Sequence, residues 1–186
     1  MTRAPLARSL AIALAAAGWV LGCYVVSTHP IRGEAPIALD PALAGTWRAF
    51  DDDLESTEQD LFTFASHGDH YVLTGAGDDE VYDVTTARLG GHRYANAVEV
   101  GGESAALFVF RYRVDGGELR IAPLDRDAVA RYAARGELAV KGDVADSARP
   151  LVLTSSGVAL EKFLLAHDPL ELFPEPSRFA SRVAEK

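Results

Sequence analysis

The stretch LFVFRYRVDGGELRIAP, residues 107–123, has the most regular alternation of apolar and polar side chains in the chain. The apolar side chains of its first half share one face of a predicted strand: Phe108, Phe110, Tyr112 and Val114. Arg111 and Arg113 fall on the other face, where they could hold an anionic group but are more simply explained by contact with water. Residues 115–117, DGG, are typical of a hairpin turn, and a partner strand then returns to Pro123. The stretch therefore predicts an antiparallel pair of strands.

Short alternating segments recur on both sides of this hairpin, with turn residues every eight to twelve positions. They span residues 45–50, 61–66, 70–74, 81–88 and 94–100. In the last of them, Val98 and Val100 are expected to face inward. No helix separates these strands, so parallel βαβ units are excluded. The pattern predicts a mainly β fold, either an antiparallel β-barrel or a strongly bent sheet.

Two short accessory helices are expected late in the chain. Asp125 can cap the first, near residues 126–135, with Gly136 as its end. The second is expected near residues 156–167, with Leu160, Phe163, Leu164 and His167 on one stripe. Strands are expected near residues 138–140 and 151–154. The polar end of the chain, residues 177–186, is predicted to fray.

Composition limits the classes of function. Hydrophobic residues make up 48% of the 186 residues and charged residues 24%, which is typical of a globular protein. The net charge of −9 disfavours binding to nucleic acid, whose phosphates would repel the chain. Cys23 is the single cysteine, so neither an internal disulfide nor a cysteine-rich zinc site can form.

The first 23 residues have the three-part pattern of a secretory leader. A start with two arginines and no acid is followed by an apolar run over residues 10–21 and by a small residue, Gly22. Val20-Leu21-Gly22-Cys23 resembles the lipobox of bacterial lipoproteins, although the family usually has Leu in place of Val20 and a small residue in place of Leu21. An uncleaved signal anchor and a plain cleaved signal peptide are the alternatives.

The lipoprotein resemblance implies a destination and a modification. Residues 1–22 would be a signal peptide, and Cys23 would be lipidated and hold the protein to a membrane. The protein would lie in the cell envelope and face the periplasm, at the outer membrane rather than the inner one, because Tyr24 is not an acidic retention signal. Residues 23–43, which contain three prolines, are predicted to be the lipidated N-terminus and a flexible tether, and residues 44–176 the β-rich domain.

Gly45-x-Trp47 at the start of the β-rich part is similar to the first signature of lipocalins and other calycins. That resemblance implies an eight-stranded barrel whose closed end is plugged by the tryptophan. The second lipocalin signature, Thr-Asp-Tyr, is absent, and the helix near residues 126–135 interrupts the family's order. Trp47 is otherwise explained as a core tryptophan. If the barrel is hollow, Phe108, Phe110 and Tyr112 are the candidate ligand-binding residues.

No pattern in the sequence predicts a catalytic site, a metal site or a cofactor. His67-Gly68-Asp69-His70 lacks an identifiable third ligand. The acidic run of residues 51–60 lacks the spacing of a calcium loop. The sequence therefore favours a lipid-anchored, non-catalytic envelope protein that binds a small apolar molecule. The alternative is a structural protein whose filled barrel is a platform for an envelope protein.

Overall fold

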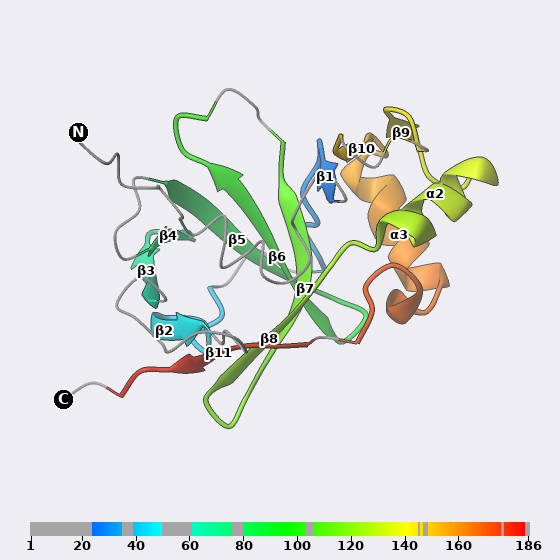
Figure 1. The fold of residues 1–186 in the computed structure, drawn as a ribbon. Coiled ribbons are helices and arrows are strands. Elements are labelled where there is room, and N and C mark those ends of the chain that lie inside the picture. Colours follow the sequence, from blue (N-terminus) through cyan, green and yellow to red (C-terminus); the bar gives the residue numbers. More distant parts are fainter. Residues whose placement is uncertain are drawn as a thin grey trace, which may run out of the picture.

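A computed structural model describes residues 24–34, 39–49, 61–75, 80–102, 106–144, 146, 149–175 and 177–184. The predicted leader, Cys23 and the acidic run 51–60 lie outside the described residues. Eight antiparallel strands close into a barrel in the order β11-β2-β3-β4-β5-β6-β7-β8 (Figure 1). Their bounds are β2 (Gly45–Ala49), β3 (Leu61–His67), β4 (His70–Gly75), β5 (Val81–Leu89), β6 (His92–Glu99), β7 (Phe108–Asp115), β8 (Glu118–Pro123) and β11 (Ser177–Arg182). The prediction of a mainly β barrel is confirmed.

The predicted hairpin forms the β7–β8 side of the barrel. Asp115 pairs with Glu118, so the turn itself contains only two residues. These are Gly116 and Gly117, with φ angles of 57° and 82°. Two successive positive φ angles are what a two-residue type I′ turn requires, and glycine adopts them without steric cost.

The end of the chain is a barrel strand, so the prediction of a frayed tail from residue 177 is wrong. β11 pairs with β8 on one side and with β2 on the other. A register shift between Arg178 and Ala180 interrupts its alternation, and both Phe179 and Ala180 are buried in the interior. A bulge of this kind removes the period-two pattern by which a strand is recognised in a sequence. The barrel therefore closes only through residues outside the predicted domain of 44–176.

A second layer covers one side of the barrel (Figure 1). It contains a three-stranded sheet in the order β1-β10-β9 and the helices that follow β8. The elements are β1 (Val25–Ser27), α2 (Arg126–Ala134), β9 (Val140–Lys141), β10 (Leu151–Leu153), α3 (Gly157–Ala166) and the 3-10 helix η2 (Pro169–Glu171). Asp125 and Ser156 cap α2 and α3 by accepting hydrogen bonds from Ala128 N and Ala159 N, which confirms both predicted helices.

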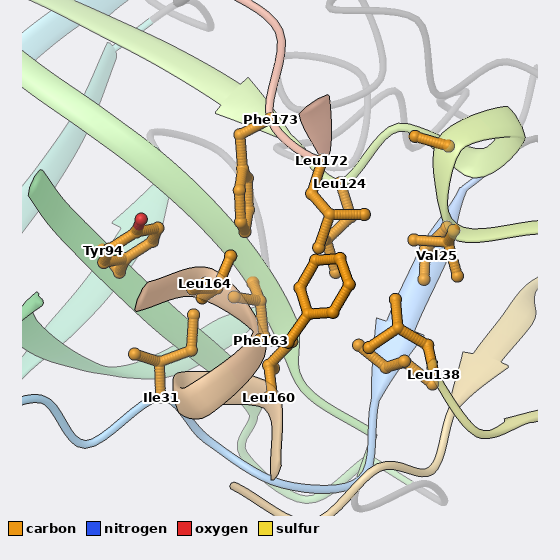
Figure 2. Packing of buried hydrophobic residues seen from close by; sticks show 14 of the residues in the cluster. Val25, Ile31, Tyr94, Leu124, Leu138, Leu160, Phe163, Leu164, Leu172 and Phe173 are labelled. Carbon is orange, nitrogen blue, oxygen red and sulfur yellow. The ribbon is translucent and has the colours of Figure 1, made fainter. Parts of the chain in front are cut away.

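Two hydrophobic clusters hold these layers. One fills the barrel and includes Trp47, Phe64, Tyr71 and Phe110, all at most 4% exposed. The other lies between the outer face of the barrel and the second layer, where Phe163 and Leu164 of α3 pack near Phe173 and Tyr94 (Figure 2). The strands of this side therefore bury side chains on both faces. Among the described residues, the side chains that point into the barrel are themselves buried and fill its interior.

The described parts of the predicted tether, residues 24–34 and 39–43, are largely packed against the barrel and the second layer, so the prediction of a flexible tether is wrong for them. Val25 and Val26 are buried in β1, which pairs in parallel with β10. Ile31 is fully buried, and its backbone N–H and C=O bond to the side chain of Asn96 at 2.8 and 2.9 Å. Gly33 lies so close to β5 that a Cβ there would be 2.3 Å from the Arg88 carbonyl oxygen. The prolines of this segment disfavour long helices or strands, but they do not exclude burial.

One predicted orientation, that of Val98 and Val100, and one expected exposure, that of Arg111, are also wrong. Val98 is half-buried and Val100 is 51% exposed, because Ala95 and Ala97 are the residues of β6 that face the barrel interior. Arg111 is only 5% exposed, since the segment after η2 covers the outer face of β7 at that point. The second layer buries outward-facing residues of β6 and β7 such as Tyr94 and Arg111, so the polarity pattern alone does not identify the inner face.

Candidate functional site

Residues 39–44, which we call the plug, close the end of the barrel where β2 begins and β11 ends. Leu43 is fully buried, and its carbonyl oxygen accepts a hydrogen bond from Trp47 Nε1 at 2.8 Å. The guanidinium of Arg182 donates to the carbonyl oxygens of Ala42 and Ala44, and its Cζ lies 4.4 Å from the centre of the Trp47 ring. Side chains of the first and last barrel strands therefore donate hydrogen bonds to main-chain oxygens of the plug, and a cation–π contact joins these two side chains to each other.

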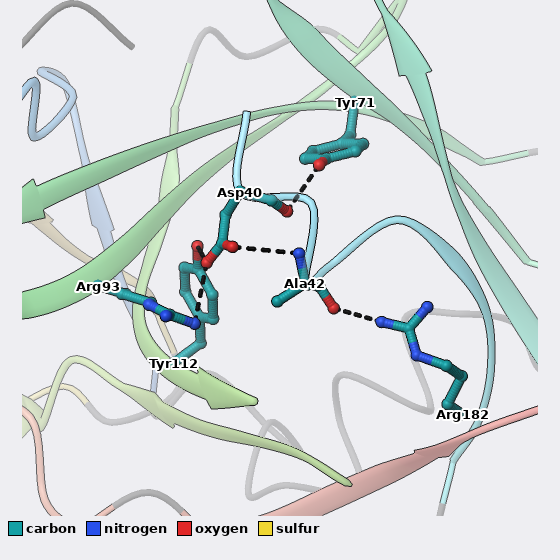
Figure 3. Close-up of polar contacts among 6 residues, drawn as sticks. All are labelled: Asp40, Ala42, Tyr71, Arg93, Tyr112 and Arg182. Atoms are coloured by element: carbon teal, nitrogen blue, oxygen red, sulfur yellow. Dashed lines mark hydrogen bonds and ion pairs between the residues drawn. The ribbon is translucent and has the colours of Figure 1, made fainter. Parts of the chain in front are cut away.

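Asp40 connects the plug to three other strands (Figure 3). Its Oδ2 accepts a hydrogen bond from the Tyr112 hydroxyl at 2.9 Å and lies 3.1 Å from Nη1 of Arg93. Its main-chain oxygen accepts from the Tyr71 hydroxyl at 2.7 Å. Its Oδ1 accepts from the backbone N–H of Ala42 at 3.1 Å. A single residue thus joins the plug to β4, β6 and β7.

Both tyrosines of this cluster are held in the protonated form. Burial, reinforced by the negative charge of Asp40, raises the pKa of Tyr112 well above its usual value near 10. Burial and Asp40 also raise the pKa of Tyr71. Below pH 10 both phenols therefore donate hydrogen bonds and are unsuited to act as bases. The arrangement is that of a latch that holds the plug in the barrel.

Of the latch residues, only Tyr112 was among the site residues predicted from sequence, and there as a ligand-binding residue. The available signal was weak: Asp40 is the one charged residue in the otherwise apolar run IALDPALAG, residues 37–45. A carboxylate within an apolar segment is buried only where it finds partners. Those partners lie 31 to 72 residues further along the chain, so sequence spacing could not identify them.

The three predicted ligand-binding residues do not line one site. Phe110 and Tyr112 are buried in the filled interior, at 4% and 3% exposure, and the Tyr112 hydroxyl is bonded to the plug. Phe108 begins β7 at the opposite end of the barrel and is half-buried. Its ring centre lies 6.2 Å from that of Tyr82 and 5.9 Å from that of Tyr24. Of the three, only Phe108 is accessible to a ligand.

A groove of about 430 Å³ lies beside the plugged end of the barrel. It is bounded by the start of β6, the end of β7 and the segment around η2. Three arginines line it, together with residues of mixed character: Arg93, Arg111, Arg113, Gly91, His92, Tyr112, Val114, Asp168, Leu170 and Glu175. Arg93 is paired with Asp40 of the latch. Arg111 and Arg113 have Glu175 as their carboxylate neighbour, at 3.7 and 3.9 Å. Apart from Arg93, the groove therefore combines two guanidinium groups with two exposed carboxylates, Asp168 and Glu175.

The remaining polar clusters do not form a metal site among the described residues. The ring centres of His67 and His70 lie 5.1 Å apart. The His70 ring nitrogens also lie 3.1 Å from Asp69 Oδ1 and 3.5 Å from Asp83 Oδ1. Within the described ranges, no group of three or more His, Cys, Asp or Glu side chains has the arrangement of a metal centre. These contacts are explained as polar pairing around the β3–β4 turn.

Comparison with known proteins does not assign a family. No protein-family model matches the chain, and neither a curated protein nor a solved structure matches it. In the described part of the chain, no helix has the length and apolar character needed to cross a membrane.

Proposed function

We propose that this protein is a lipid-anchored, non-catalytic component of the bacterial cell envelope, and that its filled barrel is a rigid platform for an envelope protein. The observation that carries the platform is the barrel interior. Trp47, Val84 and Ala95 are completely buried there, and the larger aromatic side chains around them are nearly so. A barrel filled by its own side chains acts through its outer surface.

The anchor is proposed from the sequence of residues 1–23. Its consequence for the folded domain comes from Tyr24, whose carbonyl oxygen accepts a hydrogen bond from Leu151 N at 3.1 Å. β1 begins at the next residue. Because Tyr24 is already hydrogen-bonded to the folded domain, a lipid on the preceding cysteine would hold the domain directly at the membrane surface, facing the periplasm. The outer membrane is the proposed location.

Two acyl chains on Cys23 would be sufficient to hold the protein stably in a membrane, since each buried methylene group contributes about 0.8 kcal/mol to the binding free energy. We expect Cys23→Ser to accumulate as an uncleaved precursor when the full chain is expressed in its own host. Membrane fractionation and the mass of the N-terminal peptide measure this. Normal cleavage and release of the variant would disprove the anchor, and would leave the platform to be tested separately.

A small apolar ligand is the second candidate, and the position of Phe108 favours it. This side chain is half-buried and lies beside Tyr24 and Tyr82 at the end opposite the plug. A ligand there would rest on the aromatic rim and leave the filled interior unchanged. Phe108→Ala would remove most of that contact, whereas Phe110→Ala would act on the interior.

Native mass spectrometry of the protein extracted from its own envelope in mild detergent separates the two candidates. A complex of fixed stoichiometry with another protein is expected for the platform. A bound small molecule that is lost in Phe108→Ala would support the ligand instead. A bare chain that neither crosslinks to a partner in intact cells nor retains a small molecule would contradict both.

A further inference from the structure

The arginine-lined groove beside the plugged end has a charge arrangement that the platform does not use. Arg111 is 5% exposed, so its guanidinium is largely removed from water. Its Nη2 donates to the Pro174 carbonyl oxygen at 3.1 Å and lies 3.7 Å from Glu175. Its Nε is buried and has no hydrogen-bond partner among the described residues. A buried guanidinium with unused donors is a costly arrangement unless another acceptor binds there.

The Tyr94 hydroxyl, on the neighbouring strand, is also a buried polar group without a hydrogen-bond partner among the described residues. Tyr94 pairs with Arg111 across β6 and β7. Arg113, two residues along β7, is half-exposed and points its charge to the groove. Arg120 lies directly opposite Arg113 on β8 but is already paired with Glu118 at 3.1 Å. The donors that remain available are therefore those of Arg111 and Arg113.

Glu175 occupies the position between these two arginines without satisfying either. Its carboxylate is 68% exposed and lies 3.7 Å from Arg111 and 3.9 Å from Arg113, both beyond hydrogen-bond distance. The Glu175 carboxylate is shared by two guanidinium groups, and the other carboxylate that lines the groove, Asp168, accepts a hydrogen bond from Leu170 N. Planar guanidinium groups bind carboxylate and phosphate oxygens in pairs, which is stronger than such a distant contact.

We propose that the groove binds a small molecule through an oxyanion, a phosphate or carboxylate group, held between Arg111 and Arg113 in place of the Glu175 carboxylate. The oxyanion would accept the unused guanidinium donors, and Glu175 would move into water, to which it is already largely exposed. This site is independent of the anchor at Cys23 and of the barrel interior.

The test is calorimetric titration of the full-length chain, purified in mild detergent, with sodium phosphate and with sodium acetate at constant chloride concentration. We expect Arg113→Gln to weaken binding about tenfold, the loss of one charge-assisted hydrogen bond. We expect Glu175→Gln to strengthen binding, because it removes the internal competitor. Arg149→Gln is the control, since this arginine is exposed, paired with Asp146 and outside the groove.

The two titrants identify the oxyanion. Tighter binding of phosphate than of acetate identifies a phosphate-bearing ligand, and the reverse order identifies a carboxylate. Arg113 is half-exposed, so its substitution is not expected to unfold the protein, and circular dichroism checks this. Failure of both anions to bind Glu175→Gln, or equal affinities in Arg113→Gln and Arg149→Gln, would overturn the proposal.

Discussion

Removing the Asp40 carboxylate tests whether the latch holds the plug in the barrel. In Asp40→Ala, the Tyr112 hydroxyl and Arg93 lose their shared acceptor, and Ala42 N loses the Oδ1 contact. Breaking one partner of a buried charged pair costs about 3–5 kcal/mol. The Arg93 side chain is 32% exposed, so water partly solvates its released charge and the lower end applies. We expect the free energy of unfolding to fall by about 3 kcal/mol.

Trp47 provides the assay. In a chain that begins at Tyr24, it is the single tryptophan, because the other one, Trp19, lies in the leader. Trp47 is fully buried and bonded to the plug, so its fluorescence reports plug release during urea unfolding. Asp40→Asn retains a neutral acceptor and is expected to lose roughly half as much as Asp40→Ala, since charge-assisted hydrogen bonds are about twice as strong as neutral ones.

The matched control is Asp69→Ala. The side chain of Asp69 is 92% exposed and its ion pair is with the neighbouring His70, so the change should leave the urea midpoint close to that of the unaltered chain. If Asp40→Ala is no more destabilising than Asp69→Ala, the latch does not hold the plug and the reasoning from its geometry is refuted.

Three further results are expected. Asn96→Ala should lower the free energy of unfolding by about 2 kcal/mol, because two buried hydrogen bonds to Ile31 are lost; a urea midpoint equal to that of the unaltered chain would contradict this. Deleting residues 177–186 should expose the edges of β2 and β8 and cause aggregation, which size-exclusion chromatography detects, whereas deleting only residues 183–186 should leave the elution volume of the unaltered chain. Burial raises the pKa of Tyr94 from about 10 in the unfolded chain to about 12. The contribution of the protonated phenol to stability is therefore complete below about pH 10 and declines as the pH rises toward about 12. In Tyr94→Phe, the free energy of unfolding should fall less steeply with pH in this range.

The anchor hypothesis and the fold now constrain each other. The sequence suggested a spacer of about twenty residues between Cys23 and the domain, whereas the structure begins pairing at Tyr24. A soluble form for any of these experiments must therefore start at Tyr24, because a later start removes Val25 and Val26 from the second layer. Such a truncated chain would lose β1 and expose the edge of β10.

Local sequence patterns determined the elements that depend on neighbouring residues. The alternation of residues 107–114 and the double glycine at 116–117 predicted the β7–β8 hairpin. The capping residue Asp125 predicted α2, and the apolar stripe within residues 156–167 predicted α3. Each of these signals arises from backbone geometry or side-chain periodicity over a few residues. The identity of Trp47 as a core residue also followed from its size and setting.

Tertiary structure alone decided how the barrel closes, which residues hold the plug and which side chains of its outer face are buried. β11 becomes a strand only when β2 and β8 lie on both sides of it, and its bulge hides the period that would have revealed it. Asp40 becomes a latch only when three distant strands bring Tyr71, Arg93 and Tyr112 to it. Arg111 is buried because a segment more than sixty residues away covers it. These features depend on long-range contacts, whose partners are not encoded in the spacing of neighbouring residues.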